Sequence, residues 1–86
     1  MANAKLLSEP TNYAVVHLPG RAFPGVVFQG DSLHSLISIL DRASNESDAA
    51  ERQAALCVAI ASLREAQARY EAVLAAEGIS LPYRRS

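Results

Sequence analysis

The sequence has one cysteine, one methionine, no tryptophan and no long apolar run. Because Cys57 is alone, it cannot form an intrachain disulfide, and its apolar helical surroundings predict a buried thiol in a reducing, intracellular compartment. The longest apolar run, residues 54–61, is far shorter than the roughly 20 residues that cross a bilayer. The first ten residues lack the basic-then-apolar order of a signal peptide. These absences predict a cytoplasmic protein with no membrane partner.

Charge of one sign and catalytic motifs are also lacking. The net charge is −1, and the basic residues are scattered apart from Arg84 and Arg85, so the sequence predicts no DNA partner. The two histidines, His17 and His34, lie far from each other and from Cys57, without the spacing of metal ligands. No nucleophile motif accompanies them. We therefore expect no metal, no cofactor and no enzymatic activity.

Glycine is scarce, and three of the four glycines lie between residues 18 and 33. Pro19–Gly20 and Pro24–Gly25 are typical turn pairs, and Gly30 precedes a typical helix start. Apolar residues around these turns predict three short strands, at residues 4–7, 12–18 and 26–29, with a turn at 8–12. The strands would form an antiparallel meander within residues 1–30. Both faces of the second strand carry apolar side chains, which indicates cover from a second subunit.

Two helices are predicted after the strands. The first spans residues 31–44, begins at Asp31 or Ser32 as a cap, and carries four apolar residues at the spacing of one buried stripe. These are Leu33, Leu36, Ile37 and Leu40. The second helix spans residues 47–77, from the capping pair Asp48 and Glu51 to the stop at Gly78.

The larger side chains of the second helix alternate by four and three, with Gln67 as the polar member, which predicts a heptad seam. The members are Leu56, Ile60, Leu63, Gln67, Tyr70 and Leu74. The tail at residues 78–86 either folds back on the body or is disordered. The sequence thus predicts one α+β domain over residues 1–86: a three-stranded meander, a short helix and a long helix. So small a chain without disulfides or metal is expected to be a homo-oligomer.

The candidate binding residues cluster in the glycine-rich segment. An arginine on a stiff loop can grip an anion with two hydrogen bonds, and a neighbouring phenylalanine can stack on a base. The alternative is that Arg21 is a solvated charge and Phe23 fills the core. Asp31 caps the first helix or contacts a ribose hydroxyl or base amine. The predicted ligand-binding residues are Tyr13, His17, Arg21, Phe23, Gln29, Asp31 and Ser32.

The runs NYAVV, LPGR, FPGVV, QGDSL and GISLPY resemble a family of short uncharacterised bacterial and phage-encoded proteins with the signature LPGRxFPGVVxQGDSL. This resemblance implies no particular activity. The order of strand, LPG, second strand and Gly-Asp-Ser helix start is also similar to HicB-type antitoxins, as far as Ala43. In architecture alone, a small sheet with long helices resembles phage anti-defence proteins that sequester nucleotide signals.

Two functions follow as hypotheses. The first is a non-enzymatic homo-oligomer that binds a small anionic ligand, such as a nucleotide, through Arg21 and Phe23. The alternative is an antitoxin-type or immunity-type interaction module that inhibits a partner protein.

Overall fold

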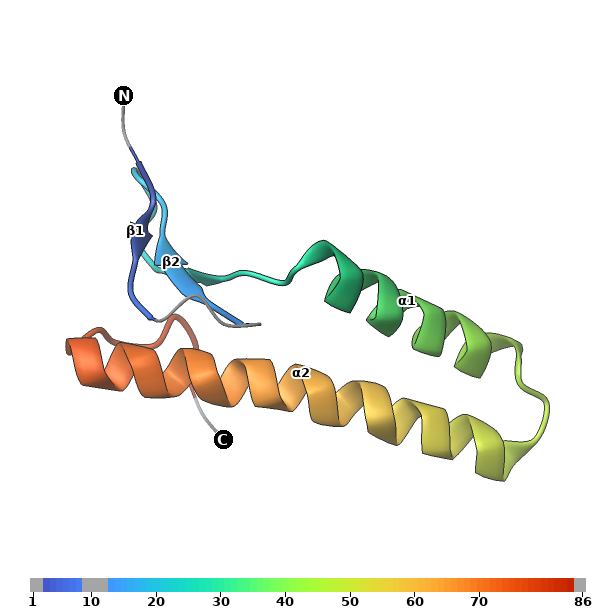
Figure 1. Cartoon of the computed structure of the whole chain (residues 1–86). Coiled ribbons are helices and arrows are strands. Elements are labelled where there is room, and N and C mark those ends of the chain that lie inside the picture. Colours follow the sequence, from blue (N-terminus) through green and yellow to red (C-terminus); the bar gives the residue numbers. More distant parts are fainter. Residues whose placement is uncertain (1–2, 9–12, 85–86) are drawn as a thin grey trace.

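The structure of the chain is a computed structural model that describes residues 3–8 and 13–84. Its elements are β1 (Lys5–Leu6), β2 (Val15–His17), β3 (Gly25–Val26), α1 (Gly30–Asn45) and α2 (Ala49–Glu77). The strands lie against the C-terminal end of α2, and α1 lies alongside the N-terminal part of α2 and antiparallel to it (Figure 1). The predicted α+β order of three strands followed by two helices is confirmed.

The sheet is antiparallel with the order β1-β2-β3, as the sequence predicts. Lys5 lies opposite His17, and Val15 lies opposite Val26. The strands are shorter than predicted, although backbone bonds from Leu7 to Val15 and from Val27 to Ala14, both 2.8 Å, extend the pairing. The predicted turn at residues 8–12 falls mostly on residues outside the described chain.

The predicted turn at Pro19–Gly20 is present between β2 and β3. The Arg21 amide donates to the Leu18 carbonyl at 3.3 Å, and Gly20 has a φ of 79°. Proline followed by a glycine of positive φ is the arrangement of a type II turn. The second pair, Pro24–Gly25, does not form such a turn, because Gly25 already belongs to β3.

The core lies where the sheet meets the C-terminal half of α2. It consists of Val15, Tyr70 and Leu74, with half-buried neighbours that include Val26 and Ile79. The Tyr70 hydroxyl donates a buried hydrogen bond of 2.7 Å to the carbonyl of Pro24. A hydroxyl inside an apolar contact needs such a partner. This bond therefore fixes α2 against the segment that enters β3.

Both ends of α2 follow the sequence prediction. Asp48 is the N-cap, and its carboxylate accepts from the Glu51 amide at 3.0 Å. Gly78 ends the helix in the left-handed conformation with a φ of 69°, and the Ile79 amide donates to the Leu74 carbonyl at 2.9 Å. Only glycine adopts this conformation without a steric penalty.

The start of α1 differs from the prediction. The N-cap position belongs to Gln29, whose side chain makes no capping bond, so the prediction of Asp31 or Ser32 as the cap is wrong. Asp31 lies instead within the first turn, where its carboxylate accepts from the Ser32 amide at 2.8 Å. A carboxylate in this turn is still favourable, because it faces the positive end of the helix dipole.

The burial of the helices corrects the prediction for α1. Of the expected buried stripe on α1, only Leu36 is buried, while Leu33, Ile37 and Leu40 are exposed. The predicted seam on α2 also divides: Tyr70 and Leu74 belong to the core, whereas Ile60 and Leu63 are exposed. The reason is that α1 contacts α2 alone among the elements, so one side of the helix pair has no cover from this chain.

Cys57 is exposed, so the prediction of a buried thiol is wrong. Its sulfur accepts from the Gln53 side chain at 3.6 Å, one turn earlier on α2. The apolar run around Cys57 does not mark a buried side of α2, because the run continues around the helix and covers its outer side as well.

We expect Cys57 to react with a thiol reagent such as dithiobis(nitrobenzoate) in native buffer at a rate close to that of a free thiol. Cys57→Ser should change the free energy of unfolding by less than about 0.5 kcal/mol, as is usual for exposed positions. Thiol-release kinetics and chemical denaturation measure the two effects. Reaction only after denaturant is added would contradict the exposed position.

Tyr70→Phe should lower the free energy of unfolding by about 1–3 kcal/mol, because it leaves the buried Pro24 carbonyl without a donor. Burial raises the pKa of Tyr70 above its ordinary value of 10.0. The unfolded state therefore loses its proton first, so stability is complete below pH 10 and falls as the pH rises above it. Tyr70→Phe should reduce this alkaline loss.

Tyr13→Phe is the matched control, because the Tyr13 hydroxyl has no hydrogen bond within the described chain. Denaturation series at pH 7 and above pH 10 should show little effect of Tyr13→Phe. Equal effects of the two substitutions would argue against a special role for the bond from Tyr70 to Pro24.

Candidate functional site

The turn between β2 and β3 carries three of the predicted binding residues. The His17 ring nitrogen Nε2 donates to the Arg21 carbonyl at 2.8 Å, which fixes the ring beside the turn. Arg21 is exposed, and its guanidinium has no hydrogen bond or ion pair within the described residues. Phe23 is 45% exposed, so the alternative that it fills the core is wrong. The turn therefore presents a cation and an aromatic ring to solvent.

The other predicted residues lie elsewhere. Gln29, Asp31 and Ser32 form the start of α1, where the bond from Ser32 to Asp31 is local. The Tyr13 ring packs edge-to-face on Phe28, with 5.3 Å between the ring centroids. No hydrogen bond joins the turn to the start of α1 within the part of the chain that the structure describes.

An aromatic cleft of about 310 Å³ lies between the sheet, α2 and the tail. Among the described residues, its lining carries no charged side chain. Both of its tyrosine hydroxyls are already engaged: Tyr70 donates to Pro24, and Tyr83 donates to Glu71 at 2.8 Å. The cleft is lined by Pro24, Gly25, Val26, Phe28, Leu63, Ala66, Gln67, Tyr70, Pro82 and Tyr83. Its chemistry suits apolar contact better than an anion.

The aromatic cleft contains none of the seven predicted binding residues. Burial and the bond to Glu71 raise the pKa of Tyr83 above its ordinary value of 10.0. This bond also shows that the tail folds back on α2, which was one of the two alternatives for it. Sequence reasoning missed the cleft because Phe28, Tyr70 and Tyr83 are distant along the chain.

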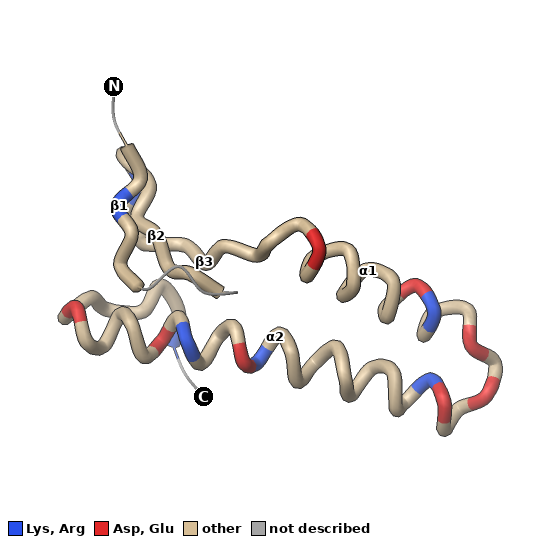
Figure 2. Tube along the Cα trace, viewed as in Figure 1, with Lys and Arg blue, Asp and Glu red and all other residues tan. Residues whose placement is uncertain are grey.

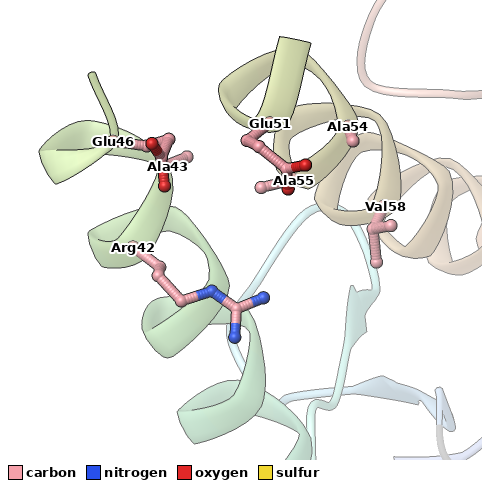
Figure 3. A pocket seen from close by; sticks show the side chains of 7 residues that line it. All are labelled: Arg42, Ala43, Glu46, Glu51, Ala54, Ala55 and Val58. Atoms are coloured by element: carbon pink, nitrogen blue, oxygen red, sulfur yellow. The ribbon is translucent and has the colours of Figure 1, made fainter. Parts of the chain in front are cut away.

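A second hollow, of about 230 Å³, lies between α1 and α2 near the loop that joins them. Figure 3 shows Arg42 on α1 and Val58 on α2 lining the same hollow. Each of these residues comes directly before a buried alanine, Ala43 on α1 and Ala59 on α2. The residues that precede the buried positions therefore lie on the same side of the helix pair.

The residues that follow the buried positions must then lie on the opposite side. Successive residues of a helix are about 100° apart around its axis, so the neighbours before and after a buried residue point to opposite sides. Ile37 follows buried Leu36, and Ile60 follows buried Ala59. Since α1 and α2 run antiparallel, these two isoleucines share one side of the hairpin.

Leu33 and Leu40 lie one turn before and after Ile37, and Leu63 lies one turn after Ile60, so they share this side. Each of the five side chains is between 40% and 50% exposed. We call this surface the hairpin face; its members are Leu33, Ile37, Leu40, Ile60 and Leu63. Figure 2 shows that the middle of α1 and the stretch of α2 beside it carry no charge. Residues 32–40 of α1 and 53–63 of α2 contain no aspartate, glutamate, lysine or arginine. The hairpin face is thus apolar and uncharged.

The model of a family of unknown function (DUF6959) matches residues 1–83. The chain belongs to this family. Its predicted membership of an uncharacterised family is confirmed, while the similarity to HicB-type antitoxins and to nucleotide-sequestering proteins stays a prediction. No curated protein and no solved structure matches the chain.

Other kinds of site find no support among the described residues. Within residues 3–8 and 13–84, no three His, Cys, Asp or Glu side chains are grouped so that they could hold a metal ion. Neither α1 nor α2 combines the length and apolar character needed to cross a bilayer. The candidate sites are therefore the Arg21 turn, the aromatic cleft and the hairpin face.

The signal for the hairpin face was present in the sequence. All five members belong to the apolar patterns of the two helices, but these patterns placed them in a buried stripe and a heptad seam with other residues, and did not show that the chain leaves them uncovered. That depends on where α1 and the sheet attach to α2.

Proposed function

We propose that this chain is a non-enzymatic interaction module that binds protein through the hairpin face. The observation that supports this is the contiguous stripe of five half-exposed aliphatic side chains without a charge among them. Soluble monomers rarely expose contiguous apolar patches of this kind, and depletion of charge marks the centre of protein interfaces. Protein binding through this face is compatible with both functions that the sequence left open: as self-association in the first, and as binding of a different protein in the second.

The energetics are consistent with binding. Covering the remaining exposed half of a leucine or isoleucine is worth about 1 kcal/mol. Five such side chains on this chain alone then contribute about 5 kcal/mol, before any contribution from the partner. Association costs on the order of 4–15 kcal/mol, so a partner with a matching apolar surface is needed.

The proposal of a non-enzymatic role is supported by the chemistry of the hollows. The aromatic cleft has no histidine, cysteine or carboxylate in its lining, so it offers no acid–base pair. The hollow near the helix loop holds Glu46 and Glu51 among its described lining residues, and the Glu46 carboxylate already accepts from the Asp48 amide at 3.0 Å.

A photo-crosslinking amino acid at position 60 should form protein adducts in cells that express the chain, and the same group at position 58 should not. Val58 is the matched control, since it is 55% exposed on the same helix but faces the opposite side. Denaturing gels followed by mass spectrometry identify the adducts. Equal labelling from both positions, or none from position 60, would refute the proposal.

A second candidate function is binding of a small anionic ligand, such as a nucleotide, at the Arg21 turn. The observation that favours it is the exposed Arg21 guanidinium, which is unpaired among the described residues and shortly precedes exposed Phe23 on a turn fixed by Pro19 and Gly20. A guanidinium and an aromatic ring in one place can bind phosphate and stack on a base. This candidate needs no enzymatic chemistry, so it is compatible with the first.

Arg21→Ala should reduce the affinity for any nucleotide found by thermal-shift screening of mononucleotides and cyclic dinucleotides by about tenfold to hundredfold. The melting temperature of the free protein should stay nearly unchanged, because the side chain has no partner in the described chain. Arg21→Lys should recover part of the affinity, since an ammonium lacks the planar fork.

Arg64→Ala, an exposed arginine on α2, serves as the control and should leave the affinity unchanged. If Arg21→Ala lowers the melting temperature and leaves the affinity intact, Arg21 is a structural residue and the ligand site lies elsewhere.

A further inference from the structure

We infer that the partner of the hairpin face is a second copy of this chain, packed so that two α1–α2 hairpins form a four-helix bundle. The inference rests on the proposed function, because it names the partner of the surface that the function assigns. Three observations support it: the open shape of the single chain, the charge of the surface, and its size.

The single chain is not compact. Its radius of gyration is 15.6 Å, whereas a compact domain of this length has about 12 Å. The largest fully buried side chains are Leu74 and Val15, and α1 is held to α2 mainly through Leu36 and small alanines. A chain with so little core needs its apolar surface covered whenever it is folded. A second copy is present wherever the chain is made, whereas a different protein need not be.

The charges permit self-association. The chain has a net charge of −1, so two copies repel each other little. The nearest charges beside the hairpin face have opposite signs, Asp41 on α1 and Arg64 on α2. The hairpin face has no charge at its centre and charges of both signs at its edge. Two such surfaces can meet without a repulsion between charges of one sign.

The size of the surface meets the requirement of a small dimer. The α1 helix of 16 residues is about 24 Å long, and two packed helices are about 20 Å wide. This gives a flat footprint of roughly 500 Å² on each copy, or about 1,000 Å² in total, which is near the lower limit for a biological interface. Such packing of antiparallel helices is the geometry of four-helix bundles.

Sedimentation equilibrium of the full-length wild-type protein tests the inference. At about 100 µM, we expect twice the single-chain mass of 9.2 kDa, and a melting temperature that rises with protein concentration. A single-chain mass at this concentration, with a melting temperature independent of concentration, would overturn the inference. This measurement needs no substitution and so does not depend on whether a variant folds.

Ile60→Glu should give the single-chain mass, because a carboxylate at the centre of the contact would be buried without a partner. Val58→Glu is the matched control and should keep the wild-type mass. Circular dichroism reports whether each variant keeps its helices. If Val58→Glu dissociates the assembly as strongly as Ile60→Glu, the contact does not lie on the hairpin face and the inference fails.

The crosslinking experiment separates this inference from the proposed function. Adducts from position 60 with the mass of two copies support both. Adducts from position 60 to a different protein, together with a single-chain mass in sedimentation, overturn the second copy as partner and leave the interaction module standing. No adducts from position 60 would refute both.

Discussion

The hydroxyl of Tyr70 donates to the Pro24 carbonyl across 46 residues of sequence, and this is the contact through which the two halves of the fold are joined. On one side of it lies the sheet, whose strands are only two or three residues long. On the other side lies α2, which meets the sheet through the small core of Val15, Tyr70 and Leu74. The directional bond sets the position of the helix, and the aromatic cleft and the folded tail follow from that position.

Away from the sheet, the buried residues of α1 and α2 are mostly small, whereas several of their large apolar residues are exposed. Ala43 on α1 and Ala59 on α2 are buried together with Leu36, while other leucines and isoleucines of the same two helices remain half exposed. Alanine lets two helix backbones approach closely but contributes little apolar area. The apolar side chains that would ordinarily be buried between the two helices are thus available to a partner. Because they are not buried, they stabilise the isolated chain less.

The elements of this fold were predictable where a local interaction determines them. The Pro19–Gly20 turn, the Asp48 cap and the Gly78 stop each depend on one or two neighbouring residues, and each occurs where the sequence predicts it. Burial was predicted less well. Leu33 and Ile37 have the periodicity of buried residues, and Cys57 lies in an apolar run, yet all three are exposed because cover depends on how distant elements attach.

The candidate sites also differ in how well the sequence predicts them. The Arg21 turn could be found because proline, glycine, arginine and phenylalanine are adjacent in the sequence. The aromatic cleft could not, because Phe28 and Tyr83 meet only through the position of α2.

The attachment of α1 has a consequence for motion. This helix contacts α2 but no strand, and it joins the rest of the chain through two short connections, at residues 27–29 and 46–48. A helix that is attached on one side only, with Leu36 and Ala43 as its buried residues, can swing away without disrupting the sheet or its joint to α2. Such an opening costs less free energy than global unfolding, so the backbone amides of α1 should exchange their hydrogens ahead of those in the C-terminal half of α2. A partner bound across both helices would close this hinge and slow that exchange.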